Sequence, residues 1–151
     1  MASSRRDNDA GTYWCVASNS YGATRSNNAT LTIASLGDDF QSQPRSEYRI
    51  TAGDILRLPC RPPKGSPTPG VTWFKDGEQL ENNSRVTITV EGHVIISNAQ
   101  AEDTGSYICQ AMNIIGTRET PATRVDIISK SVYKIYKFNS YLILEYMKTN
   151  N

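Results

Sequence analysis

The sequence contains no hydrophobic run long enough to cross a membrane. A membrane-spanning helix needs roughly 18 consecutive apolar residues, and no segment of the 151 residues comes near that length. Residues 1–10 are polar and lack the apolar centre of a secretory signal peptide. We therefore expect this chain to contain neither a signal peptide nor a transmembrane segment.

An excess of charge of either sign is also absent. Lysine and arginine total 16 and the acidic residues 15, so the formal net charge is +1. No basic stripe with interleaved aromatic residues occurs, and the composition therefore does not predict a nucleic acid partner. The hydrophobic fraction of 38% is typical of a soluble protein with a modest core.

Side chains that bind metals are too few for a zinc site. The chain has three cysteines and one histidine, and no C-x-x-C pair. A structural zinc site needs about four nitrogen or sulfur ligands at short spacings. The sequence therefore predicts no metal ion and no cofactor.

Catalytic motifs are missing as well. His93 stands between Gly92 and Val94 in a predicted hairpin, without a nucleophile motif or a glycine-rich phosphate loop. The carboxylate pairs Asp38–Asp39 and Glu102–Asp103 are adjacent in sequence, so we expect them to point apart along strands. These observations predict that the protein is not an enzyme.

Short strands, in contrast, are strongly indicated. Apolar residues repeatedly alternate with polar ones, and turn residues separate the alternating segments. The predicted strands cover residues 55–60, 71–74, 86–90, 94–97 and 107–112. Several short strands at this spacing are typical of an antiparallel β-sandwich.

One motif occurs twice. The pattern D-x-G-x-Y-x-C-x-A-x-N-x-x-G begins at Asp9 and again at Asp103, 94 positions later. This offset is close to the length of one immunoglobulin domain. A full set of predicted strands precedes the second copy, whereas the first copy starts close to the N-terminus.

The repeat predicts an all-β chain with an immunoglobulin-like I-set sandwich and part of another. Residues 1–35 are predicted to be the C-terminal strands of a truncated immunoglobulin domain, and residues 36–39 a junction. Residues 40–128 are predicted to form a complete I-set domain. We expect residues 129–151 to be a disordered tail outside the domain, with a short amphipathic segment or an added strand as the alternative.

The spacing of two cysteines and a tryptophan locates the predicted core. Cys60 and Cys109 are 49 positions apart with Trp73 between them, which is typical of the immunoglobulin core. The two cysteines would lie on facing sheets, joined by a disulfide against which the indole packs. We expect Leu58 and Tyr107 in the same core, and we predict that the cysteines are structural.

Tyr107 also occupies the position of a tyrosine corner. It lies two residues before Cys109, where the hydroxyl of such a tyrosine bonds to nearby backbone. Asp103 belongs to the turn that precedes it, and Arg85 begins the strand at residue 86. We predict an ion pair between Arg85 and Asp103.

Three further residues carry predictions about an oxidising, secretory environment. Cys15 has no predicted partner in its own unit, so we expect an unpaired thiol. Asn28 and Asn82 each begin an N-x-[ST] sequon and are predicted N-glycosylation sites.

Several segments resemble the Roundabout (Robo) family of receptors. Residues 36–40, Leu-Gly-Asp-Asp-Phe, are similar to the join between the first two immunoglobulin domains of that family. The proline-rich residues 60–69 and the following residues 71–77 resemble the opening of the second domain. Residues 21–22 and 28–30 resemble the end of the first domain, so the resemblance covers residues 9 to about 128.

The resemblance implies a fragment of an axon-guidance receptor on the extracellular side of the plasma membrane. It implies a secreted, Slit-like protein ligand, with assistance from heparan sulfate. In the family the first domain makes most of the Slit contact, and Arg5 and Arg6 fall in the corresponding basic loop that binds sulfated sugar. Because the front of that domain is expected to be missing, we expect this chain alone to bind Slit weakly.

Two other hypotheses stay open. The chain could be an immunoglobulin-superfamily adhesion module that makes homophilic or heterophilic contacts, or a structural domain of a matrix or muscle-type array. The sequons and the Asp38–Asp39 junction favour the receptor and adhesion hypotheses over the array. The junction combined with the proline-rich segment favours a guidance receptor over an adhesion module.

Overall fold

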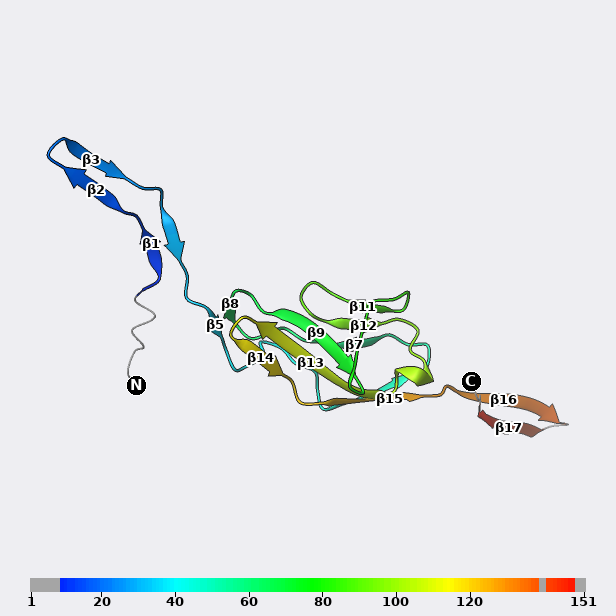
Figure 1. Cartoon of the computed structure of the whole chain (residues 1–151). Coiled ribbons are helices and arrows are strands. Elements are labelled where there is room, and N and C mark those ends of the chain that lie inside the picture. Colours follow the sequence, from blue (N-terminus) through cyan, green and yellow to red (C-terminus); the bar gives the residue numbers. More distant parts are fainter. Residues whose placement is uncertain (1–8, 139–140, 149–151) are drawn as a thin grey trace.

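The computed structural model describes residues 9–138 and 141–148. These residues form short strands and one 3-10 turn at Ala101–Asp103, and the strands β1–β4 extend as an arm from the body formed by β6–β15 (Figure 1). The strands are β1 (Gly11–Tyr13), β2 (Val16–Asn19), β3 (Gly22–Arg25), β4 (Ala29–Leu31), β5 (Ser35–Leu36), β6 (Glu47–Thr51), β7 (Leu56–Leu58), β8 (Gly65–Ser66), β9 (Gly70–Lys75), β10 (Glu78–Gln79), β11 (Val86–Ile88), β12 (Val94–Ile96), β13 (Gly105–Asn113), β14 (Gly116–Glu119), β15 (Thr123–Ile128), β16 (Ser131–Phe138) and β17 (Tyr141–Lys148).

Two sheets form the body of the molecule. The larger has the strand order β10-β9-β13-β15-β6, with β14 also pairing β13, and the smaller has the order β11-β12-β7. The predicted all-β sandwich is confirmed. One pairing differs from the purely antiparallel expectation, because β6 runs parallel to β15, from Arg124↔Glu47 to Ile128↔Thr51.

The core lies between these two sheets and is closed by a disulfide. Cys60 follows β7 and Cys109 lies in β13, and their sulfurs are bonded with the Cα atoms 6.5 Å apart. Trp73, Leu58 and Tyr107 are completely buried beside them. The predicted alternation holds along β7, where Leu56 and Leu58 are buried and the intervening arginine is exposed. The other buried members of the cluster are Tyr48, Val86, Val94, Ile96 and Val125.

The arm repeats the pairing of the second motif copy. β1 pairs antiparallel with β4 so that Gly11 faces Leu31, and 94 positions later Gly105 faces Val125 in the same way. The β2–β3 hairpin closes on Asn19↔Gly22, as the β13–β14 hairpin closes on Asn113↔Gly116. The repeat in sequence is therefore a repeat in backbone structure.

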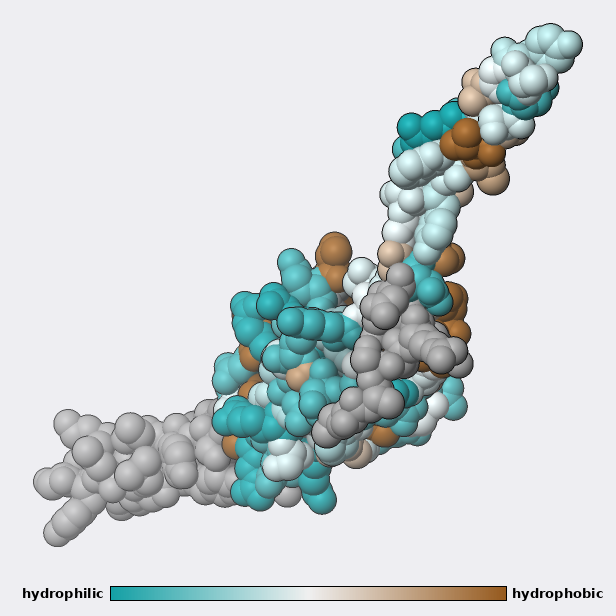
Figure 2. Space-filling view, turned by 90° about the vertical axis from the view of Figure 1, so that its left-hand side faces the viewer, coloured by the Kyte–Doolittle hydropathy of each residue, from teal (hydrophilic) through white to brown (hydrophobic). Residues whose placement is uncertain are grey.

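The two copies of the motif differ in how deeply their side chains are buried. Tyr107 and Val125 are completely buried, whereas their counterparts Tyr13 and Leu31 are 49% and 47% exposed. Figure 2 shows hydrophobic side chains on the surface of the arm, in contrast to the mainly hydrophilic face of the body. Among the described residues, the arm has strand pairing but no second sheet that covers it.

The C-terminal segment forms two strands, as in the alternative of an added strand, rather than the disordered tail that the sequence predicted first. β16 and β17 pair antiparallel over eight residues each, from Ser131↔Lys148 to Phe138↔Tyr141. Both strands are rich in aromatic and branched aliphatic residues, which favour extended backbone. Period-two alternation and turn residues, the signals used for the other strands, did not identify this hairpin.

We predict that the disulfide supplies a large part of the stability of the body. Replacing Cys60 and Cys109 together by alanine should lower the free energy of unfolding by about 4 kcal/mol, the chain-entropy value for a loop of this length. Denaturant unfolding followed by circular dichroism would measure this loss. Cys15→Ser is the matched control and should change the free energy little, because Cys15 is exposed and outside the disulfide. An equal loss in both variants would contradict the assignment.

Candidate functional site

A network around Arg85 joins the two sheets at one end of the sandwich. The Arg85 guanidinium donates from Nη1 to Asp103 Oδ2 at 2.7 Å and from Nη2 to Asp103 Oδ1 at 3.2 Å. The Asp103 carboxylate also accepts a hydrogen bond from the Gln100 backbone N–H at 2.7 Å. Asp103 is buried, and a buried charge needs hydrogen-bond partners. Two guanidinium N–H groups of Arg85 and one backbone amide supply them.

Glu102 also binds this arginine, which corrects one sequence-based expectation. We expected adjacent carboxylates to point apart, but Arg85 Nη2 donates to Glu102 Oε1 at 2.6 Å. Glu102 and Asp103 lie on a 3-10 turn rather than on a strand, so their side chains do not alternate across a sheet. The hydrogen bond to Asp103 raises the pKa of Arg85, which stays charged.

The tyrosine corner is formed in both copies of the repeat. Tyr107 Oη donates to the Asp103 carbonyl at 2.7 Å, and Tyr13 Oη donates to the Asp9 carbonyl at 2.6 Å. Burial raises the pKa of Tyr107, so its hydroxyl remains a donor. The corner thus connects the strand β13 to the same turn that Arg85 holds.

His93 has a structural position that the sequence did not reveal. Its Nδ1 accepts a hydrogen bond from the Cys60 backbone N–H at 3.0 Å, and its own backbone N–H bonds Thr89 Oγ1 at 3.1 Å. The neighbouring Gly92 carbonyl accepts the Trp73 indole N–H at 2.7 Å. The hairpin that contains the histidine therefore supports the disulfide and the tryptophan.

The junction between arm and body is held by strand pairing and by specific hydrogen bonds. The strand β5 pairs with β8, and the Gly37 N–H donates to the Lys64 carbonyl at 2.8 Å. The Asn113 Nδ2 group donates to the carbonyls of Ser35, at 2.8 Å, and Pro67, at 3.0 Å. Side chains from the β13–β14 hairpin therefore fix the segment that precedes the domain.

A close backbone contact at Gly65 and an ion pair between Arg118 and Asp38 also hold the junction together. A Cβ atom at Gly65 would lie 2.9 Å from the Ser35 carbonyl oxygen and 3.1 Å from the Asn113 amide nitrogen, which leaves room for glycine only. Asp38 accepts hydrogen bonds from Arg118 Nη2 at 2.8 Å and Nε at 3.1 Å. The sequence marked residues 36–39 as a junction but gave no sign of these distant partners.

Exposed apolar side chains gather at the tip of the hairpin beside this junction. Ile114 is 78% exposed and Ile115 52%, and Met112 at the end of β13 is 58% exposed. The Ile115 N–H bonds to Asn113 Oδ1 at 2.9 Å, so the residue that holds the junction also shapes the tip.

The remaining predicted residues lie apart from one another. Asn28 is exposed between β3 and β4, and its Oδ1 accepts from Arg25 Nη2 at 2.6 Å. Asn82 is exposed between β10 and β11. Cys15 is exposed on the arm without a disulfide. Arg5 and Arg6 lie outside the described residues, so the predicted sulfate-binding loop stays a prediction, as does glycosylation.

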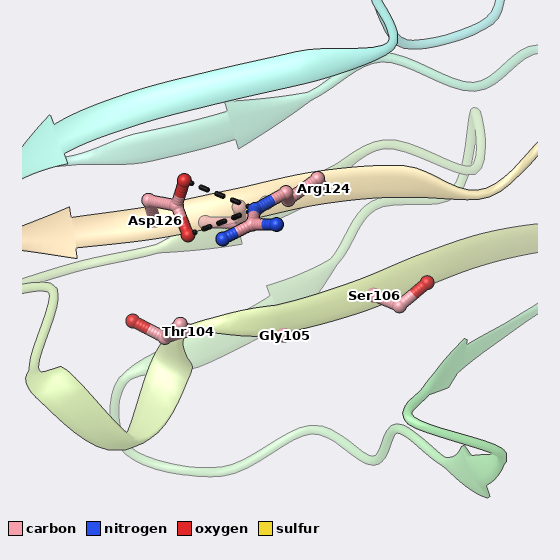
Figure 3. Close-up of a pocket in the computed structure, with 6 residues that line it drawn as sticks. Thr104, Gly105, Ser106, Arg124 and Asp126 are labelled. Carbon is pink, nitrogen blue, oxygen red and sulfur yellow. Dashed lines mark hydrogen bonds and ion pairs between the residues drawn. The ribbon is translucent and has the colours of Figure 1, made fainter.

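A shallow pocket lies between β13 and β15. It has a volume of about 340 Å³ and is lined by residues 104–106 and 124–126. Figure 3 shows Arg124 and Asp126 side by side on β15, where Arg124 Nε donates to both carboxylate oxygens at 3.1 Å. Arg124 is exposed, and its ion pair with Asp126 largely neutralises the charge at this pocket.

Two classes of feature are absent from the part of the chain that the structure describes. No group of three or more histidine, cysteine, aspartate or glutamate residues there could hold a metal ion. No helix within residues 9–138 and 141–148 has the length and apolar character to cross a membrane. The exclusion of enzymatic activity stays a prediction from the sequence.

The chain is similar to known proteins with immunoglobulin domains. Residues 38–124 match the family model of the immunoglobulin I-set domain. The chain is 37% identical over 131 residues to Protein sax-3 of Caenorhabditis elegans, covering 85% of this chain and 10% of that protein. It is 41% identical over 123 residues to Roundabout homolog 3 of Homo sapiens, covering 81% of this chain and 9% of that protein. The predicted resemblance is therefore confirmed, and the chain spans about a tenth of these relatives.

A solved structure gives the same result at the level of the fold. The tandem immunoglobulin repeats of Dlar superpose with a TM-score of 0.58 at 31% identity. The similarity covers 81% of this chain and 64% of that chain. The predicted immunoglobulin-like sandwich is confirmed.

We predict that Asp103 matters far more for stability than Glu102, although both bind Arg85. Asp103→Ala removes the buried carboxylate that binds the partly buried guanidinium and accepts the Gln100 N–H, and should lower the free energy of unfolding by about 2 kcal/mol. Glu102 is 69% exposed at its side chain, and Glu102→Ala should cost less than about 1 kcal/mol. Thermal and denaturant unfolding of both variants would check this. Equal stability of the two variants would refute the assigned importance of the buried pair.

We also predict that Asn113 controls the order of the junction. Asn113→Ala removes the donors to Ser35 and Pro67, each worth about 1 kcal/mol, so the Gly37 amide should exchange with solvent several-fold faster. Hydrogen exchange measured by NMR would follow that amide directly. Gln110→Ala is the matched control, because Gln110 bonds only Glu119 across the same hairpin. Unchanged exchange at Gly37 in Asn113→Ala would rule out this role.

Proposed function

The chain belongs to the immunoglobulin I-set family, and from this we propose that it is part of the extracellular portion of an axon-guidance receptor of the Roundabout type. In this role it contributes to binding a secreted, Slit-like protein ligand at the cell surface. Heparan sulfate assists through Arg5 and Arg6. The whole receptor's signalling depends on parts outside this chain.

The observation that carries the proposal is similarity across the junction. The relatives match the arm and the body together rather than the I-set domain alone. The junction is also the place where distant residues meet, since Asp38 binds Arg118 and Asn113 binds Ser35. A ligand that contacts two successive domains needs their orientation to be set, and these contacts supply it.

The hairpin tip supports contact with a protein rather than a small molecule. Ile114, Ile115 and Met112 are exposed apolar side chains at the tip of the β13–β14 hairpin. Protein interfaces use such apolar anchors with a polar rim, whereas small-molecule sites are concave and enclosed. The pocket between β13 and β15 is shallow and open, so it does not enclose a small molecule in this way.

Adhesion through identical chains is the second candidate. The exposed apolar residues of the arm, Tyr13, Trp14 and Val16, favour it, because such a surface also promotes association of like chains. A Slit-binding measurement and a self-association measurement distinguish the two candidates.

We predict weak, salt-dependent binding of the full chain to immobilised Slit, strengthened by added heparan sulfate. Replacing Arg5 and Arg6 by alanine should remove the strengthening by heparan sulfate, because the sulfates lose their cationic partners. Surface plasmon resonance at two salt concentrations would measure both effects. The matched control replaces Arg49 and Arg124, two exposed arginines of the body, and should leave the heparan sulfate effect intact.

Sedimentation of the same preparation tests the adhesion candidate. A chain that ignores Slit but forms dimers at micromolar concentration would overturn the guidance proposal in favour of adhesion. A chain that binds Slit equally well with and without Arg5 and Arg6 would remove heparan sulfate from the proposal.

A further inference from the structure

The strand β11 forms an edge of the smaller sheet, whose order is β11-β12-β7. Arg85 and Thr89, which flank the strand, exchange backbone hydrogen bonds with the β12 side: Ser97 N–H donates to the Arg85 carbonyl and Thr89 N–H to the His93 carbonyl. In an antiparallel pair the direction of the N–H groups alternates. The N–H groups of Val86 and Ile88 therefore point away from the sheet.

Two consecutive asparagines accept both of these outward N–H groups. Ile88 N–H donates to Asn82 Oδ1 at 2.6 Å, and Val86 N–H donates to Asn83 Oδ1 at 2.8 Å. The Asn83 N–H in turn donates to the Val86 carbonyl at 2.9 Å. The loop between β10 and β11 thus caps the edge with side chains where a neighbouring strand would otherwise pair.

The capped strand belongs to a segment that is prone to pair with other chains. Residues 86–90 read Val-Thr-Ile-Thr-Val, with high β-propensity, no charge and no proline. Thr87 is exposed, and Val90 is completely exposed in the turn that follows. Exposed edges of this composition need protection, which proteins commonly supply with charge, proline or a covering group.

Asn82 is also the first residue of the sequon Asn82-Asn83-Ser84, in a loop where all three side chains are exposed. Its Oδ1 is engaged by Ile88, whereas its Nδ2 has no hydrogen-bond partner in the described part of the chain. A sugar is attached to Nδ2, so the modification leaves the bond to the strand in place. Ser84 is likewise exposed and makes no side-chain hydrogen bond within the described residues.

We propose that Asn82 carries an N-linked glycan, and that this glycan adds to the asparagine caps by covering the edge of β11 and keeping the segment 86–90 from pairing with another chain. The donor is a lipid-linked oligosaccharide pyrophosphate. A bond forms between Nδ2 and the anomeric carbon, the bond from that carbon to the pyrophosphate oxygen breaks, and Nδ2 loses one proton. The glycan requires the secretory route but not any particular ligand of the receptor.

The test uses the full chain, directed into the secretory pathway of cultured cells by an added signal sequence. Enzymatic removal of the glycan in ¹⁸O-water converts a glycosylated asparagine to labelled aspartate, which peptide mass spectrometry locates. We expect the label at Asn82. An unlabelled Asn82 in the secreted protein would overturn the proposal, whatever the result of the Slit measurement.

The protective effect is tested by variants that keep both capping asparagines. Ser84→Ala should lose the glycan and lose monomer several-fold faster than the parent on size-exclusion chromatography at equal concentration. Thr30→Ala, which removes the sequon at Asn28, is the matched control and should not accelerate this loss. Ser84→Thr keeps the sequon and should behave as the parent protein does.

A rescue variant tests whether the edge itself is responsible. Adding Thr87→Lys to Ser84→Ala places a charge on the exposed side of β11 and should restore the lifetime of the monomer, because an edge lysine opposes strand pairing. If Ser84→Ala survives as long as Thr30→Ala, or if Thr87→Lys restores nothing, the glycan does not protect this edge.

Discussion

The disulfide between Cys60 and Cys109, packed against Trp73, is the constraint on which the rest of the body depends. It joins the two sheets across a core in which Leu58 and Tyr107 are also fully buried. Closing a loop of 49 positions restricts the unfolded chain strongly. The hairpin around His93 supports the Cys60 end of this bridge and the tryptophan, because His93 binds the Cys60 amide and the adjacent glycine carbonyl binds the indole. With the sheets held in this way, the Arg85 network and the junction have fixed places to attach.

The arm shows what the same motif achieves without a covering sheet. Its local hydrogen bonds match those of the body: Cys15 N–H binds Ser26 Oγ as Cys109 N–H binds Thr120 Oγ1, both near 3 Å. The turn bond from the Tyr21 N–H to Asn19 Oδ1 likewise matches that of Ile115 and Asn113. Local sequence therefore sets strand pairing and turns, whereas burial depends on chain that packs from elsewhere.

This division explains how much could be predicted from the sequence. The strands, the disulfide and the buried tryptophan follow from period and spacing, which are local signals or a single distant pair. The partners of Asn113 and Arg118 could not be predicted, because they lie 78 and 80 positions away and only the fold brings them together. Glu102 was expected to point away from Asp103 because a 3-10 turn was taken for a strand. The role of His93 was missed because one histidine in a hairpin carries no pattern.

The structure also divides its surface between regions that accept contact and one that resists it. The hairpin tip at Ile114 and Ile115 is apolar and exposed, and Asn113 holds it at the junction. The edge of β11, in contrast, is a place where contact would be harmful. A strand of another chain that paired there would extend the sheet and could lead to aggregation. Asparagine side chains already occupy the outward N–H groups of this edge. The proposed receptor role needs both properties together, since a face that selects a ligand is useful only while the sheet edges reject neighbouring copies.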